Sequence, residues 1–201
     1  MRLSKKIKVG IDSPSAAGAG TLSKMLAAHY NLLYCDTGKV YRFLAKSIII
    51  SKPKSNYLHL KKISKKVNLK KLQDKSLLSD EVAFVASQIA KDLKIRKLVV
   101  KFQKNLAYHP PKKFNGSILD GRDINSKIVK NADFKFYVTA SLECRTKRRF
   151  LELKKLGKRP KYREVLQSIN HPLAEAVLDL REKSKMAGTY ISNIQKISHL
   201  F

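Results

Sequence analysis

The sequence lacks any apolar segment long enough to cross a membrane. No stretch approaches the roughly 18 consecutive apolar residues that a membrane-spanning helix requires. Residues 1–8 lead into a predicted strand and not into a cleavable apolar segment. Cysteine is also scarce: Cys35 and Cys144 fit no C-x-x-C spacing, and we expect two reduced, buried thiols. These absences favour a soluble, cytoplasmic protein with no membrane partner.

Acidic residues are few, because 15 Asp and Glu stand against 43 Lys and Arg, a formal net charge of +28. Clustered basic residues are typical of proteins that bind nucleic-acid phosphates. Here the lysines are spread from Lys5 to Lys196, and no RNP, zinc-finger or helix-turn-helix signature accompanies them. We interpret most of this charge as solvated surface and expect no specific nucleic-acid partner, with a nonspecific polyanion-binding protein as an alternative.

Four short apolar segments indicate an α/β fold, and the hydrophobic content of 43% in 201 residues is enough for the core of one domain. We predict buried parallel strands over residues 7–12, 32–36, 117–120 and 134–139. In an open α/β sheet, ligands bind outside the carboxyl ends of the strands. We therefore expect Asp12, Asp36 and Asp120 to face one crevice.

Residues 39–114 contain no strong strand pattern and are predicted to be mostly amphipathic helix. Val82, Val85, Ala86 and Ile89 recur at helical spacing. Residues 109–111, His-Pro-Pro, end the helical region before the third predicted strand.

A loop of small residues follows the first predicted strand and leads into an apolar helical pattern. Its backbone N–H groups and the helix N-terminus can hold an anion without a charged side chain. Such loops usually add a lysine, but Ala19 stands at that position. Lys24 is a possible substitute, but it lies about 140° round the helix from Ala19, which places it away from the loop. A turn that serves only close packing is the alternative. The candidate phosphate-binding residues are Ser13, Pro14, Ser15, Ala16, Ala17, Gly18, Ala19, Gly20 and Thr21.

Four further blocks follow the loop in order, and together the five resemble the bacterial cytidylate kinase family over about residues 5–169. The blocks are Asp36-Thr37-Gly38 with Tyr41-Arg42; residues 85–90 with Ile95-Arg96 and Gln103; Asp120-Gly121-Arg122-Asp123; and Arg145 with Arg148-Arg149. The resemblance implies a P-loop nucleoside monophosphate kinase fold, a parallel sheet flanked by helices with a helical acceptor-binding insertion. It also implies phosphoryl transfer from ATP to CMP or dCMP, with Mg²⁺ near Thr21.

The resemblance also implies roles for individual residues within one domain, 1–201, which we expect to be a monomer. Its core would be residues 1–38 and 115–169, and its nucleotide-acceptor region residues 39–114. The implied CMP-binding residues are Thr37, Arg42, Ser87, Arg96, Asp120, Arg122 and Asp123. The implied catalytic residues are Arg149, Arg145 and Arg148. Surface ion pairs are the alternative for Arg42 and Arg96, and a solvated helix face is the alternative for Arg149. For Asp120 and Asp123 the alternative is a salt bridge with Arg122, and for Ser87 it is a bond to its own backbone.

The tail, residues 170–201, departs from the family pattern. It has no Asp-Arg-Asp motif, no convincing closing strand, and Arg181 as the sole nearby arginine candidate. Residues 170–194, from Asn-His-Pro-Leu onward, show a short resemblance to a segment of family A DNA polymerases, for which chance is the alternative. With Ala19, this departure makes a catalytically impaired nucleotide-binding remnant the alternative to an active kinase.

Overall fold

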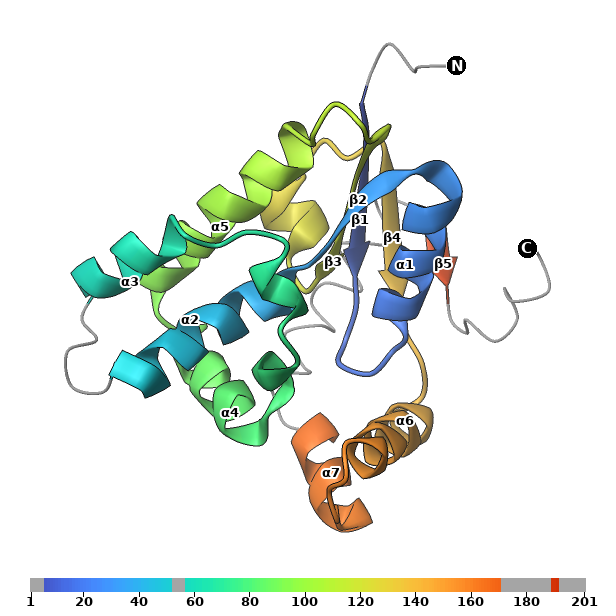
Figure 1. The fold of residues 1–201 in the computed structure, drawn as a ribbon. Coiled ribbons are helices and arrows are strands. Elements are labelled where there is room, and N and C mark those ends of the chain that lie inside the picture. The colour runs from blue at the N-terminus through green and yellow to red at the C-terminus, as the bar shows by residue number, and fades with distance from the viewer. Residues whose placement is uncertain (1–5, 52–56, 171–188, 192–201) are drawn as a thin grey trace.

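A single parallel β-sheet organises the computed structural model, which describes residues 6–51, 57–170 and 189–191. Five strands belong to it among the described residues, in the order β2-β3-β1-β4-β5 (Figure 1). Their bounds are β1 Ile7–Asp12, β2 Leu32–Asp36, β3 Gly116–Gly121, β4 Phe134–Val138 and β5 Thr189–Ile191. Every pairing between neighbours is parallel.

The four predicted strands are confirmed, with bounds that differ by one residue at most. The closing strand is where the prediction fails: the sequence indicated none that was convincing, yet β5 pairs parallel with β4. Three residues are too few to show an alternating pattern, so this strand is specified by its neighbour in the sheet rather than by its own sequence.

The two faces of the sheet are covered by different helices. Helix α1 (Ala19–Tyr30) packs on one face, where its Leu22 joins a buried cluster with Ile11 and Ile118. The other face is covered by α2 (Thr37–Ser51) and α5 (Leu93–Tyr108), and the neighbouring strand residue Leu119 belongs to their cluster. Alternate residues of β3 thus serve opposite faces, as in any strand buried on both sides.

The chain between β2 and β3 is helical, as predicted. Besides α2 and α5 it forms α3 (Tyr57–Ser64), α4 (Asp80–Ile89) and the short 3₁₀ helices η2 (Lys71–Gln73) and η3 (Lys75–Leu78). The described residues of this segment include no strand. Ser79 and Asp92 accept hydrogen bonds from the first turns of α4 and α5, which fixes where these helices begin.

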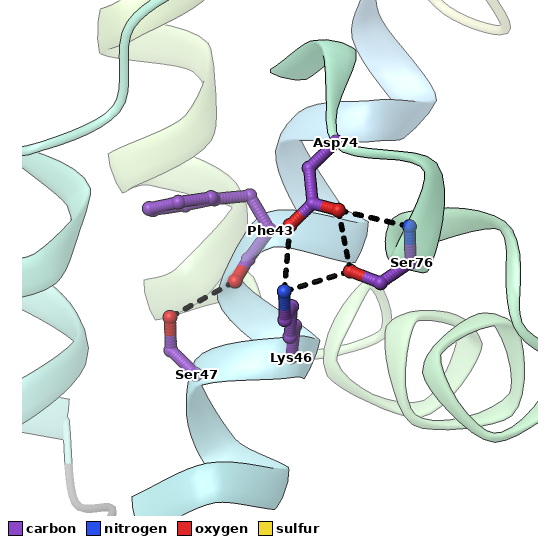
Figure 2. Close-up of polar contacts among 5 residues, drawn as sticks. All are labelled: Phe43, Lys46, Ser47, Asp74 and Ser76. Atoms are coloured by element: carbon purple, nitrogen blue, oxygen red, sulfur yellow. Dashed lines mark hydrogen bonds and ion pairs between the residues drawn. The ribbon is translucent and has the colours of Figure 1, made fainter. Parts of the chain in front are cut away.

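A polar contact joins α2 to η3 (Figure 2). The Lys46 ammonium donates to Asp74 Oδ2 at 2.6 Å and to Ser76 Oγ at 2.7 Å. The hydrogen bonds that Asp74 accepts from Lys46 and from the hydroxyl and backbone N–H of Ser76 lower the pKa of its carboxyl to about 2. Leu77 follows Ser76 directly and is fully buried. The contact therefore holds in place the backbone of Leu77, whose carbonyl receives Arg42.

Helices α6 (Leu142–Lys155) and α7 (Tyr162–Asn170) lie beyond the carboxyl ends of the strands. Figure 1 places them on the same side of the sheet as the loop that links β1 to α1. None of the helices in the described ranges is both long and apolar enough to span a membrane.

Candidate active site

The loop between β1 and α1 has the backbone of an anion-binding nest. Gly18 has φ 101°, and Ala16 has φ 60°, a left-handed conformation that a residue with a Cβ adopts only at a cost. Such alternation turns successive N–H groups toward one side, where they can surround an anion. Positive φ angles at two positions of one short loop, one of them a residue with a Cβ, favour a binding role over simple close packing.

Helix α1 begins directly after this loop with unused donors. The N–H groups of Thr21 and Leu22 donate to the Gly18 carbonyl at 3.1 and 3.2 Å. Those of Ala19 and Gly20 have no carbonyl partner within the described chain. The Ala19 methyl is buried, and Thr21 is exposed. The helix start therefore presents N–H donors and one hydroxyl, and no charge from position 19.

Two carboxylates end neighbouring strands beside the start of α1. Asp36 of β2 and Asp120 of β3 are partners in register. A Cβ added to Gly20 would lie 3.4 Å from Asp120 Oδ2, so the carboxylate reaches the first turn of α1. Burial, and then the charge of Asp36, raise the pKa of Asp120 to about 7, while a hydrogen bond from Tyr34 and the charges of Lys24 and Lys39 lower it. Two of the three expected crevice acids thus meet here.

Asp12 does not face this crevice, contrary to the sequence expectation. Its carboxylate accepts hydrogen bonds from the backbone N–H groups of Ile124 at 2.6 Å and Asn125 at 3.2 Å. Burial raises the pKa of Asp12 to about 7. Asp12 therefore fixes the turn after β3, which carries Arg122 and Asp123, because unpaired N–H groups there would otherwise be buried.

Arg42 and Arg149 bring like charges together from α2 and α6. The Arg42 guanidinium donates to the Leu77 carbonyl at 2.9 Å. Burial lowers the pKa of Arg42, and the positive charge of Arg149 lowers it further. Arg149 pairs with Glu152 of its own helix at 2.8 Å. Arg149 thus has an ion-pair partner on its own helix, but its charge still acts on Arg42.

A second pair of like charges borders the phosphate loop. Arg122 donates to Ser15 Oγ at 3.0 Å, and burial lowers its pKa. Arg145 donates to the Ser15 carbonyl at 3.5 Å. Burial lowers the pKa of Arg145, as does the charge of Arg122, and Nε of Arg145 is buried without a partner among the described residues. Arg148 donates to the Ala17 carbonyl at 2.8 Å.

The remaining predicted acceptor residues have partners within the protein. Arg96 forms an ion pair with Asp123 at 2.6 Å, and Asp123 also binds Lys127 at 2.7 Å. The buried Thr37 hydroxyl donates to the Asp120 carbonyl at 2.7 Å. Ser87 is exposed, and its hydroxyl donates to the Phe84 carbonyl of its own helix at 2.7 Å, which matches the alternative for this serine.

The sequence analysis missed two groups that contact site residues, the Tyr34 hydroxyl and the Leu77 carbonyl. Tyr34 donates to Asp120 Oδ2 at 3.1 Å; its position two residues before Asp36, on the same face of β2, was the available signal. The Leu77 carbonyl leaves no side-chain signal at all. Arg181 and the polymerase-like segment lie outside the described residues, apart from residues 189–191.

Replacing Asp120 with asparagine is expected to stabilise the protein increasingly as pH rises from about 4 to about 7. Because the folded state raises the pKa of this carboxyl from 3.8 to about 7, it binds more protons than the unfolded chain over that range. The contribution of Asp120 to the free energy of unfolding therefore falls as pH rises. An asparagine amide does not titrate, so the variant does not lose this stability. We expect a gain on the order of 1 kcal/mol or more at pH 8, where each unit of pKa difference is about 1.4 kcal/mol. Urea unfolding at several pH values measures it, and a gain independent of pH would contradict it.

Known proteins resemble this chain in sequence over most of its length. Residues 9–174 match the family model described as cytidylate kinase. A cytidylate kinase of Bartonella tribocorum is 36% identical over 170 residues, which cover 82% of this chain and 75% of that protein. One of Rhodopseudomonas palustris is 38% identical over 150 residues, covering 74% and 69%. A solved shikimate kinase of Bacteroides thetaiotaomicron aligns with a TM-score of 0.48 at 14% identity, covering 93% and 85%, which is too distant to bear on function.

Proposed function

The chain belongs to the cytidylate kinase family, and we propose that it transfers the terminal phosphoryl group of ATP to CMP or dCMP, giving ADP and CDP or dCDP. One observation carries the proposal: arginines of α6 and of the turn after β3 contact the phosphate loop. Like charges also act on each other here, Arg149 on Arg42 and Arg122 on Arg145. An anion bound between such cations relieves their repulsion, and guanidinium groups suit phosphates as bidentate ligands.

The phosphates of ATP would lie on the nest of residues 13–21. The N–H groups at the start of α1 face that position, and the helix dipole adds positive potential there. Arg145 and Arg148 bind carbonyls of the same loop, so α6 is already in place beside it. Binding of ATP therefore requires no side chain at position 19, although it is weaker without one.

The residues beside the loop suit a magnesium ion. Mg²⁺ prefers oxygen ligands and is usually bound by one or two carboxylates together with substrate phosphates and water. Asp36 and Asp120 supply carboxylates, and the exposed Thr21 hydroxyl lies at the start of α1. Asp120 is buried with poor charge compensation, as its raised pKa indicates. When bound, Mg²⁺ would neutralise charge on the transferring phosphates.

The acceptor nucleotide would bind between α2, α5 and the turn after β3. Arg42 and Arg96 can each hold the monophosphate with two parallel N–H donors, and Arg122 lies between that position and Ser15. Asp123 is oriented by Arg96 and Lys127, and its carboxylate is a suitable acceptor for the exocyclic amine of cytosine. Ser87 and Thr37 would complete the set with small contributions, since both hydroxyls already donate within the protein.

The chemical step would rest on positioning and electrostatics. Phosphoryl transfer needs little covalent participation by the protein; charge that develops on the moving group must be stabilised. Arg145 and Arg148 contact the loop from α6. Arg149 lies four residues beyond Arg145 on the same face of that helix and is the candidate for this role. Release of Arg149 from Glu152 would free its guanidinium for the phosphoryl group.

A catalytically impaired nucleotide-binding remnant is the second candidate, and Ala19 is the observation that favours it. Its buried methyl leaves the helix start without the usual cation. A polyanion-binding protein is the weaker alternative, because the arginines gather around one loop and the other basic residues are spread widely.

A coupled assay with ATP and each of CMP, dCMP, UMP and AMP tests the proposal, together with calorimetric titration of ATP and Mg²⁺. We expect turnover with CMP or dCMP well above that with AMP, and binding of ATP at millimolar concentration or better. Binding of ATP and CMP without turnover would identify the impaired remnant. No ATP binding at millimolar concentration would contradict a phosphate-binding loop.

A further inference from the structure

We propose that the ammonium group of Lys24 supplies to bound ATP the positive charge that Ala19 does not. The inference rests on the proposed function in one respect, namely that ATP binds at the loop before α1. Lys24 lies just over one helical turn beyond position 19, where such loops usually carry their lysine, and on the side of α1 that borders Asp120.

The position of Lys24 follows from its neighbour Gly20 on α1. Residues four apart on a helix are offset by only about 40° and lie on one face. Gly20 faces the carboxyl ends of β2 and β3, since a Cβ there would lie 3.4 Å from both Asp120 Oδ2 and the Tyr34 hydroxyl. Lys24 therefore emerges on the face that borders the crevice, one turn along the helix from the loop.

The Lys24 side chain can reach back over the one helical turn that separates its Cα from the phosphate loop. Helical side chains lean toward the helix N-terminus, which here is the phosphate loop. Lys24 is exposed, and among the described residues no direct ion pair holds its ammonium. The long flexible stem can therefore carry the charge back along α1.

The sequence expectation placed Lys24 away from the loop, because it took the direction of Lys24 from Ala19. Gly20 is the better reference, because it shares one face of α1 with Lys24 and faces the carboxyl ends of β2 and β3. Lys39 lies on the acceptor side, at the start of α2, where its backbone N–H donates to Asp36 Oδ1 at 3.3 Å.

The test compares ATP and CMP in matched variants: Lys24→Ala, Lys24→Arg, Lys39→Ala, Ala19→Lys, and the double variant of Ala19→Lys with Lys24→Ala. Lys104→Ala is the control. Lys104 is exposed near the C-terminal end of α5, which leads to the start of β3 and so to the end of the strands opposite the site. Binding of ATP with Mg²⁺ and of CMP is measured by calorimetry, kcat and KM by the coupled assay, and Tm by thermal unfolding.

Lys24→Ala should weaken ATP binding at least about fivefold and lower kcat/KM for ATP about tenfold, while CMP binding stays within about twofold. Lys24→Arg should keep most of the ATP affinity, because the charge is preserved. Lysine at position 19 should make Lys24 dispensable, so the double variant should match Ala19→Lys within about twofold, a coupling that a structural role would not produce. Lys104→Ala should behave as the wild type.

Three results would overturn the assignment. The first is unchanged ATP binding in Lys24→Ala. The second is an equal loss of ATP and CMP affinity in Lys24→Ala with a lowered Tm, which Ala19→Lys does not restore. The third is a loss of ATP affinity in Lys39→Ala and in no Lys24 variant. The proposed function fails separately, if the wild type binds ATP yet phosphorylates no nucleoside monophosphate. In that case the ATP titrations still decide the role of Lys24.

Discussion

Replacing Ala19 with lysine is expected to raise the cytidylate kinase activity at least about tenfold. One preorganised group that stabilises developing charge typically contributes about 10²- to 10³-fold to the rate. Lysine is a good helix former, and the residue before it, Gly18, already has the conformation that begins α1, so the backbone need not change. We expect less than the full factor because Lys24 already supplies part of the charge.

Ala19→Met is the matched control, since methionine has a similar stem without a charge. Lysine at position 19 should raise kcat, and methionine should lower or leave it, because methionine brings a similar stem without the charge that stabilises the phosphoryl group. The coupled assay measures both, with CMP at saturation. A gain in the methionine variant, or none in the lysine variant, would show that charge at this position is not what limits the rate.

The sheet could be predicted because each long strand carries its own signal. Strand β1 has alternate buried apolar residues, Val9 and Ile11, and β3 has consecutive ones, Ile118 and Leu119. Both patterns are typical of strands buried on both faces. The order of the strands and the existence of β5 could not be predicted, because pairing depends on neighbours that are distant in the sequence.

The sequence suggests candidate residues for the site but not the contacts they make. Glycine and small residues before a helix indicate the loop, and arginine blocks indicate anion binding. That Asp12 turns toward Ile124, or that Arg42 is held by the Leu77 carbonyl, depends on side-chain directions and on a backbone group that no residue type encodes. The pair of Arg42 and Arg149 arises between α2 and α6, more than a hundred residues apart, and only the folded chain brings them together.

Alanine at Arg42 is expected to weaken CMP binding about ten- to a hundredfold and leave ATP binding nearly unchanged. Truncating one member of a charge-assisted pair costs about 1.5–3 kcal/mol, and each 1.4 kcal/mol is about tenfold in affinity. Arg42 is half-buried on α2 and does not contact the loop, whereas Arg122 donates to Ser15 within it. We therefore expect Arg122→Ala to weaken the binding of both CMP and ATP, and Arg42→Ala to weaken the binding of CMP alone.

Arg163→Ala is the matched control for Arg42→Ala, because Arg163 is an exposed arginine of α7. Calorimetric titration with CMP, AMP and ATP at two salt concentrations distinguishes the alternatives. A site built around Arg42 loses CMP affinity in one variant and retains it in the other. A polyanion-binding surface would bind CMP, AMP and free phosphate alike, and removing any one of 43 basic residues would matter little. Equal effects of the two substitutions would therefore exclude Arg42 as the acceptor clamp, since surface cations act together and a clamp acts through its position.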